Sequence, residues 1–236
     1  MLAAIIIASI ATLPIVYLLN KLARTPRFQI IGELINHVNT PEKVVALTYD
    51  DGPSLCHTNQ LLNLLERLQV KATFFVVGQK IEENPEIVRQ LVSKGHELGN
   101  HSYSHQRMFW KKPSFIRSEI EKTDQLLRQL GVKDELHFRA PFGIKFLILP
   151  YILTKMKKKN ILWDVDPKDY QESNPEVISN YVLKHVVPGS IILLHDFERA
   201  SSPTIRATEF IIQKLQEKGY KFKTVSELLH CYSKTE

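Results

Sequence analysis

The chain has 236 residues, of which 44% are hydrophobic and 24% are charged. These proportions are typical of a packed globular protein and exclude a disordered chain, a collagen-like repeat and a polytopic membrane protein. Two cysteines are too few for a disulfide-stapled scaffold or a Cys₄ zinc site. Half of the formal net charge of +6 comes from the first 30 residues, so the remaining body is nearly balanced. That balance argues against nucleic-acid binding, and no protein partner is predicted.

Residues 1–19 are mostly apolar and carry no charged side chain. As a helix they would span roughly 28 Å, which is close to the ~30 Å hydrocarbon core of a bilayer. We expect residues 1–20 to form a transmembrane anchor, with a cleaved signal peptide as the main alternative. The anchor is favoured because no basic residue precedes the apolar run and no clear small-x-small cleavage site closes it. Residues 21–41 are predicted to be a basic juxtamembrane connector.

Between residues 42 and 230, short apolar runs alternate with amphipathic segments, and nothing marks a second domain before a short tail over residues 231–236. The apolar runs predict strands at Val44–Tyr49, Ala72–Val77, Glu97–Gly99, Leu136–Arg139, Ile161–Val165, Ser190–Leu194 and Tyr220–Phe222. Helical spacing predicts helices at Asn59–Leu68, Pro85–Ser93, Pro113–Leu130, part of Lys145–Lys158, Pro175–Val186, Thr204–Glu217 and from Ser226. This alternation is typical of an α/β fold with a parallel sheet. About seven such units suit a single distorted or incomplete (β/α) barrel, with a doubly wound open sheet as the alternative.

Polar side chains end or follow five of the predicted strands. They are Asp50 with Asp51, His101 with His105, Arg139, Asp166 with Asp169, and His195 with Asp196. In a parallel barrel the carboxyl ends of the strands share one face, which is where active sites form. Each cluster alone is more often a turn or a surface charge, but five clusters on one predicted face indicate an active site.

Five segments resemble the motifs of the polysaccharide deacetylases, the NodB-homology family also called carbohydrate esterase family four. Thr48–Pro53 resembles its TFDDGP motif, and His101–His105 resembles its H-S/T-x-x-H motif. Arg139–Phe142 resembles the Arg-x-Pro-Phe/Tyr motif, and Leu193–His195 resembles Leu-x-His. Asp166–Tyr170 resembles Asp-x-x-Asp-Trp, with a tyrosine in place of the tryptophan. All five appear in the family's order, over roughly residues 42–230.

The resemblance implies that Asp51, His101 and His105 bind one divalent metal ion, for which we expect Zn²⁺, with Co²⁺ as an alternative. Two imidazoles and a carboxylate leave coordination positions open, as in catalytic rather than structural sites. Such an ion lowers the pKa of a bound water and polarises a carbonyl group. Asp50 is implied to be the general base. Because successive side chains on a strand diverge, we expect a turn to bring Asp50 and Asp51 together.

The resemblance also implies that His195 is the general acid that protonates the departing amine. The unperturbed pKa of a histidine lies close to neutral pH, which suits that role. Asp169 is implied to orient His195. Arg139 is implied to hold the base carboxylate, for which a guanidinium fork is well suited.

By the same resemblance, the backbone N–H of Phe142 stabilises the oxyanion, and Phe142, Pro141 and Tyr170 form the substrate pocket. The departure at Tyr170 is expected to change the shape of the pocket more than its chemistry, because a phenol is smaller than an indole.

The implied function is a metal-dependent hydrolase that removes acetyl groups from N-acetylglucosamine units of a polysaccharide or oligosaccharide, such as peptidoglycan or chitin-like oligomers. Its products are acetate and a free amine. One alternative is an O-acetyl esterase or a deformylase acting on a lipid-linked amino sugar in the same fold. A more remote alternative is a non-catalytic glycan-binding module. The expected partners are the N-acetylated glycan and the membrane.

The location of the catalytic domain can be argued in two directions. The basic residues after the anchor would keep the domain in the cytoplasm by the positive-inside rule. Long domains cross a membrane largely regardless of flanking charge, and cell-wall glycans lie outside, so we expect an extracytoplasmic domain. The basic cluster of Lys155 and Lys157–Lys159 is interpreted as a solvated helix end, with an anionic partner such as a lipid phosphate as the alternative.

Overall fold

The computed structural model describes residue 17, residues 21–197 and residues 203–232. Apart from Tyr17, the predicted anchor lies outside these residues, as does most of the predicted tail. Among the described residues, no helix combines the length and the apolar character needed to cross a bilayer.

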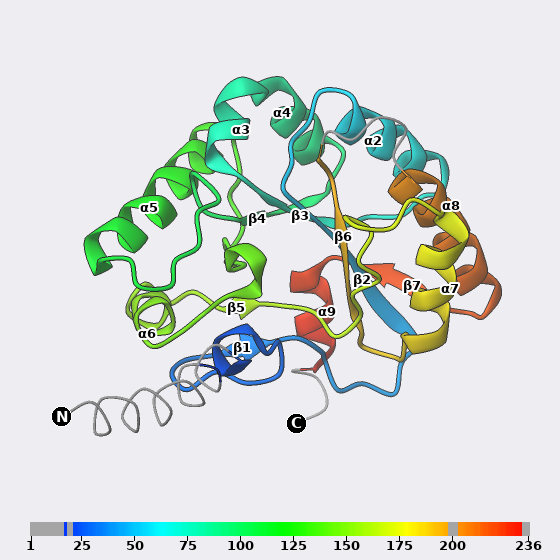
Figure 1. Ribbon diagram of the computed structural model, residues 1–236. Helices are drawn as coiled ribbons and strands as arrows, with labels where there is room; N and C mark the ends of the chain where they lie inside the picture. The colour runs from blue at the N-terminus through cyan, green and yellow to red at the C-terminus, as the bar shows by residue number, and fades with distance from the viewer. Residues whose placement is uncertain (1–16, 18–20, 198–202, 233–236) are drawn as a thin grey trace, which may run out of the picture.

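Parallel strands form the centre of the molecule (Figure 1). Five of them make one sheet in the order β4–β3–β2–β6, with β7 also paired to β2. Their bounds are β2 Val44–Asp50, β3 Thr73–Val76, β4 Glu97–Asn100, β6 Ile191–His195 and β7 Lys221–Lys223. A two-stranded parallel sheet pairs β1 (Leu34–Ile35) with β5 (Asn160–Ile161). All seven residues of β2 are buried, so this strand is the axis of the fold.

Single-residue parallel bridges connect the two sheets into a ring. Phe138 pairs with Asn100 at the end of β4 on one side and with Asn160 of β5 on the other, and Val165 pairs with Ile192 of β6. The strand order therefore returns to β6, which gives a distorted barrel of parallel strands. The α/β class and the parallel sheet predicted from the sequence are confirmed.

Helices surround the ring, with α2, α3 and α4 above the strands, α5 and α6 on one side and α7 and α8 on the other (Figure 1). Their bounds are α2 His57–Arg67, α3 Gly78–Glu83, α4 Pro85–Ser93, α5 Pro113–Gln129, η1 Pro141–Gly143, α6 Ile148–Lys155, α7 Pro175–His185, α8 Pro203–Glu217 and α9 Val225–Tyr232. Four of the α-helices, α4, α5, α7 and α8, begin at a proline. Proline suits a first helical position because its ring fixes φ and its missing N–H has no helical partner there.

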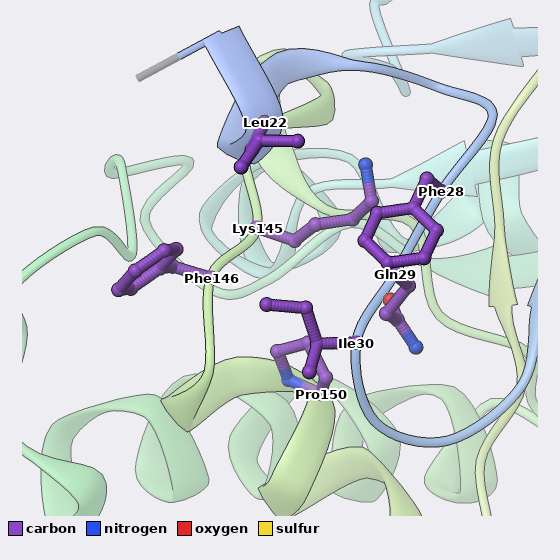
Figure 2. A pocket seen from close by; sticks show the side chains of 7 residues that line it. All are labelled: Leu22, Phe28, Gln29, Ile30, Lys145, Phe146 and Pro150. Carbon is purple, nitrogen blue, oxygen red and sulfur yellow. The ribbon is translucent and has the colours of Figure 1, made fainter. Parts of the chain in front are cut away.

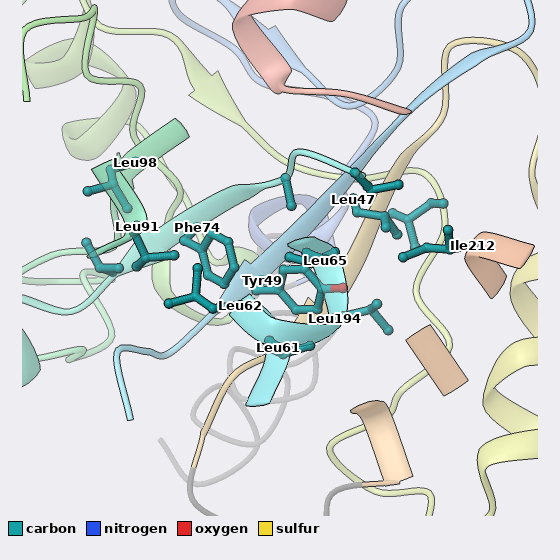
Figure 3. Close-up of a cluster of buried hydrophobic side chains, with 14 of the residues drawn as sticks. Leu47, Tyr49, Leu61, Leu62, Leu65, Phe74, Leu91, Leu98, Leu194 and Ile212 are labelled. Carbon is teal, nitrogen blue, oxygen red and sulfur yellow. The ribbon is translucent and has the colours of Figure 1, made fainter. Parts of the chain in front are cut away.

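The main core lies between β2 and the helices that cover it. Leu47 and Tyr49 of β2 pack with Leu61 and Leu65 of α2 and with Phe74 of β3 (Figure 3). Alternate residues of a strand point to opposite faces, so the residues between them point into the ring. This alternation aims the polar end of β2 at the interior, where the site is built.

The segment 21–41, predicted to be a connector, packs against the barrel. The carbonyl oxygen of Ala23 accepts a hydrogen bond from Lys145 N at 2.8 Å, and Val38 N donates to Gly189 O at 3.0 Å. Strand β1 lies within this segment, as the partner of β5. A two-residue strand has too little periodicity to be detected in the sequence, and its hydrogen-bond partner is more than 120 residues away.

Most other predicted elements agree with the structure to within a few residues, but the predicted strand Ile161–Val165 is reduced to β5 and an isolated bridge at Val165. The predicted strand Leu136–Arg139 is a single bridge at Phe138, although its backbone is hydrogen-bonded on both sides. Helix α3 was not predicted; it begins at Gly78, directly after the predicted strand Ala72–Val77. A Cβ at Gly78 would lie 2.6 Å from the ring of Tyr103, so close packing requires this glycine.

The contact between the segment 21–41 and the barrel can be tested at Gly189. Its φ is +86°, and an added Cβ would lie 1.7 Å from the carbonyl oxygen of Val38. Gly131 is the matched control, because its φ is +95° but nothing lies within 4 Å of an added Cβ. We expect Gly189→Ala to lower the free energy of unfolding by about 1–3 kcal/mol more than Gly131→Ala, measured by urea unfolding. Equal losses would show that the segment does not press on the barrel here.

Candidate active site

The inner face of β2 brings Asp50 into the ring. Thr48 and Asp50 point inward, opposite to the core residues Leu47 and Tyr49. In the parallel pairing of β2 with β6, Asp50 is aligned with His195. The two predicted proton-transfer groups therefore end neighbouring strands at the same level.

The guanidinium of Arg139 is fully buried inside the ring. Its Nη1 donates to Thr48 Oγ1 and to Asp50 Oδ1, each at 2.7 Å. Its Nε and Nη2 donate to the carbonyl oxygens of Ile161 and Leu162 at 3.0 and 3.1 Å. A buried charge is tolerated only when it is paired and hydrogen-bonded, and these contacts meet that requirement. Arg139 thus fixes one oxygen of the Asp50 carboxylate.

Asp51 leaves the strand direction at a φ of +73° and turns its carboxylate towards two imidazoles. Asp51 Oδ1 lies 3.0 Å from His105 Nε2 and 3.4 Å from His101 Nε2. Ligand atoms of the three residues all lie within 4.8 Å of one another. This donor set, two imidazoles and a carboxylate, fits a divalent ion such as Zn²⁺ and leaves coordination positions for water and substrate. Asp50 Oδ2 lies 3.6 Å from His101 Nε2, so the predicted base borders the same position.

The ionisation of Asp51 suits a metal ligand. Burial by itself raises the pKa of this carboxyl, but hydrogen bonds and charge from His101 and His105 outweigh it. They hold the pKa of Asp51 well below its usual range. The carboxylate is therefore anionic throughout the physiological pH range.

The two histidines are oriented by groups that the sequence did not reveal as functional. His101 Nδ1 donates to the carbonyl oxygen of Arg139 at 2.9 Å, which leaves Nε2 as the ligand atom. Asn100 Oδ1 accepts from Ser102 N at 2.8 Å, and Glu119 Oε2 accepts from Ser104 N and Oγ at 2.8 and 2.9 Å. The sequence gives one sign that Glu119 has a role, because this carboxylate lies on the apolar face of the predicted helix Pro113–Leu130.

His195 is held by a buried carboxylate. Asp169 accepts from His195 Nδ1 at 2.7 Å through Oδ1, and from His195 N and Thr204 Oγ1 at 2.9 and 2.8 Å through Oδ2. Burial lowers the pKa of His195, but the Asp169 hydrogen bond and the charges of Asp169, Asp50 and Asp51 raise it to about 9. The imidazole is therefore cationic at neutral pH, with Nδ1 occupied by Asp169 and Nε2 available to a substrate.

Comparison with known proteins agrees with this geometry. Residues 37–161 match the polysaccharide deacetylase family. The chain belongs to the polysaccharide deacetylase family. It is 35% identical over 200 residues to a peptidoglycan-N-acetylglucosamine deacetylase of Bacillus cereus, covering 84% of this chain and 93% of the relative. It is 32% identical over 196 residues to a chitooligosaccharide deacetylase of Bradyrhizobium, covering 78% and 90%.

A crystal structure of a peptidoglycan N-acetylglucosamine deacetylase superposes with a TM-score of 0.78 at 31% identity, over 82% of this chain and 91% of that one. The resemblance inferred from the five motifs is thus confirmed. As a member of this family, the deacetylase is a hydrolase of carbon–nitrogen bonds other than peptide bonds.

A cavity of about 450 Å³ opens over the site of the deacetylase. Of the predicted residues, it is lined by Asp50, Asp51, His101, His105, Phe142, Tyr170 and His195. The Phe142 ring lies 4.6 Å from the His105 ring, at a residue with a φ of +59°. Pro141 is buried in η1 and does not line this cavity. Residues that the sequence did not reveal also line it, namely Arg24, Arg107, Trp163 and Phe197.

Asp196 supports the loop that carries Asp50 and Asp51, a role the sequence did not assign. Its carboxylate accepts hydrogen bonds from Thr58 Oγ1 and Ser54 Oγ, and its N–H donates to the carbonyl oxygen of Asp50 at 2.8 Å. Burial raises the pKa of Asp196 to about 7, while the hydroxyl donors oppose that rise. Asp196 is thus a positioning residue for the loop that carries Asp51, one of the candidate metal ligands.

Because Arg139 contacts both the strands of the ring and the Asp50 carboxylate, we expect its removal to cause a large loss of stability. Arg139→Met leaves the Asp50 carboxylate buried without its cation, and two carbonyl oxygens lose their donors. We expect the free energy of unfolding in urea to fall by about 3–5 kcal/mol. Arg117→Met is the control, because Arg117 pairs with Glu121 on the exposed face of α5 at 3.4 Å and should cost less than about 1 kcal/mol. Similar losses for the two variants would contradict this assignment.

Proposed function

We propose that this deacetylase removes acetyl groups from N-acetylglucosamine units of a glycan such as peptidoglycan or a chitin-like oligomer. The observation that supports it is the convergence of three groups of different chemistry in one cavity. Adjacent strands end in the buried carboxylate of Asp50 and the cationic imidazole of His195. Both line the same cavity as the candidate metal ligands Asp51, His101 and His105. The named relatives act on glycans of this kind.

Residues Asp51, His101 and His105 would hold a divalent ion that polarises the acetyl carbonyl and lowers the pKa of a water molecule. Asp50 is the base for that water. Its Oδ1 is occupied by Arg139, so the proton goes to Oδ2, which faces the histidine pair. Arg139 also holds the Asp50 carboxylate in its orientation before the reaction.

His195 completes the hydrolysis as the acid. Water adds its hydroxyl to the acyl carbon, the carbon–nitrogen bond breaks, and the nitrogen takes a proton from His195 Nε2. Asp169 holds Nδ1 and stabilises the cationic form, so the proton is present before the substrate arrives. The products are acetate and a free amine, and the proton on Asp50 restores His195 through solvent.

The walls of the cavity suit a sugar. Phe142, Trp163 and Tyr170 line it and offer aromatic faces to the apolar face of a pyranose ring. In this proposal the backbone N–H of Phe142 donates to the developing oxyanion.

We also propose that residues 1–20 anchor the enzyme and that its catalytic domain is extracytoplasmic, because cell-wall glycans lie on that side. Cleavage of the domain by protease added to intact spheroplasts tests this location, and full protection would contradict it.

The activity is tested by acetate release from N-acetylglucosamine oligomers by the full chain in detergent micelles. The full chain is used because Ala23 and its neighbours contact the barrel. We expect no acetate after metal stripping and restored release on adding Zn²⁺ or Co²⁺. Formate release, or ester cleavage with the amide intact, would instead favour the deformylase or esterase alternative. Glycan binding without any acid release would favour the non-catalytic module.

Two variants separate metal binding from turnover in the same assay. Asp51→Asn should lose bound Zn²⁺ and activity together. His195→Ala should retain Zn²⁺ and lose at least about 100-fold in kcat, because it removes only the general acid. Full activity in both variants would overturn the assignment of these residues.

The fall of kcat/KM at alkaline pH, the alkaline limb of the pH profile, reports the pKa of the general acid. His195 must be protonated, so kcat/KM falls as pH rises through its pKa, which is about 9. Asp169→Asn removes the charge that raises this pKa, so we expect the limb to move to lower pH by about 2 units. Glu176→Gln, an equal loss of charge at the exposed start of α7, is the control and should leave the limb in place. An unmoved limb in Asp169→Asn would show that His195 is not the acid.

A further inference from the structure

Exposed apolar side chains gather on the face of the barrel where the N-terminal segment meets it. Phe28 and Ile30 are 52% and 58% exposed, and Trp110 is 75% exposed. Tyr151 on α6 is 53% exposed, and Phe146 joins these residues at the centre. We call Phe28, Ile30, Trp110, Phe146 and Tyr151 the anchor-side patch.

Contacts with Phe146 hold the patch together. Phe146 lines one small cavity with Phe28, Ile30 and Pro150, the neighbour of Tyr151, and Figure 2 shows the residues that surround it. The Phe146 ring lies 6.2 Å from the Trp110 ring. Phe28, Ile30 and Phe146 therefore form one surface with Pro150 of α6, and Tyr151 is the next residue of that helix.

The segment 21–41 fixes the patch relative to the predicted anchor. Lys145 donates from its backbone N to Ala23 O at 2.8 Å and from its Nζ to Thr25 O. Asn160 Nδ2 donates to Gln29 Oε1 at 2.8 Å. The apolar run of residues 1–19 ends just before Lys21, so a bilayer holding that run would lie beside the patch.

The two segments that carry Phe28, Ile30 and Tyr151 also carry exposed cations. Lys21, Arg27, Lys155 and Lys157 are exposed, and neither residues 21–32 nor residues 148–159 contain an acid. Lys155 Nζ also lies 5.7 Å from the centre of the Tyr151 ring. Of the basic cluster, Lys158 pairs with Asp124 at 2.8 Å and Lys159 lies 3.7 Å from Glu135 Oε1, so the interpretation as a solvated helix end holds only in part.

We propose that the anchor-side patch docks on an anionic lipid bilayer. Aromatic rings and cations at the end of an apolar span are the composition that membrane interfaces favour. Arg24, which lines the active-site cavity, lies in the same short helical stretch as Lys21. Docking therefore places one rim of the cavity next to the bilayer. The inference rests on the proposed anchor at residues 1–20 and not on the proposed deacetylation.

The test uses tryptophan fluorescence of the full chain in vesicles of phosphatidylcholine and phosphatidylglycerol. The chain has two tryptophans, Trp110 in the patch and Trp163 in the cavity. With brominated acyl chains, we expect quenching in the wild type that is lost in Trp110→Phe. Equal emission of the wild type in brominated and unbrominated vesicles would overturn the proposal.

Variants of the patch locate the effect. Phe28→Ser with Ile30→Ser and Tyr151→Ser should reduce the quenching at least about threefold, because much of the apolar area is removed. The control Tyr181→Ser with Phe210→Ser changes two exposed aromatics on α7 and α8 and should leave quenching unchanged. Far-UV circular dichroism checks that both variants fold.

Other occupants predict different results. If the patch were covered by the chain's own N-terminal run or by a second copy, Trp110 would be shielded from acrylamide in detergent micelles and unquenched by brominated lipid. Replacement of phosphatidylglycerol by phosphatidylcholine should weaken quenching in the docked state, because the cations lose their partners. Quenching that does not depend on the anionic lipid would overturn the electrostatic part of the proposal.

Discussion

The guanidinium of Arg139 lies inside the barrel and hydrogen-bonds to β2 on one side and to the end of β5 and the residue after it on the other. Its backbone carbonyl oxygen also accepts a hydrogen bond from His101 Nδ1. Arg139 therefore connects strands on opposite sides of the ring, and it also contacts the base carboxylate of Asp50 and the candidate metal ligand His101. Burial lowers the pKa of this guanidinium, and the charge and hydrogen bond of Asp50 oppose that change. Since each charge is tolerable only beside the other, the fold and the site depend on the same ion pair.

Much of the chemistry could be predicted because it follows regular strands. Asp50 and His195 come directly after buried apolar runs, and the carboxyl ends of parallel strands meet on one face. Arg139 was harder to predict from strand periodicity, because its strand is reduced to one bridge at Phe138. The motif, rather than the periodicity, identified it.

What the sequence could not reveal depends on contacts between distant segments. Asn100, Glu119 and Asp196 act through the loops that they hold. The place of Glu119 on the apolar face of a helix and that of Asp196 after a strand single them out, but neither reveals which loop the side chain contacts. The segment 21–41 looked like a linker because its only strand has two residues. Its order comes from the β5 partner and from Lys145, both of which are far away in the chain.

The alignment of Asp50 with His195 across β2 and β6 has a consequence for the evolution of the chain. The side-chain period of a strand is two, so one inserted or deleted residue before either end turns that side chain to the opposite face. A change of two residues restores the face but moves the group by roughly 7 Å along the barrel axis. Neither strand can change in length without separating the acid from the base. Variation in length among relatives should therefore accumulate in the loops on the opposite rim, while these two strands keep a constant number of residues.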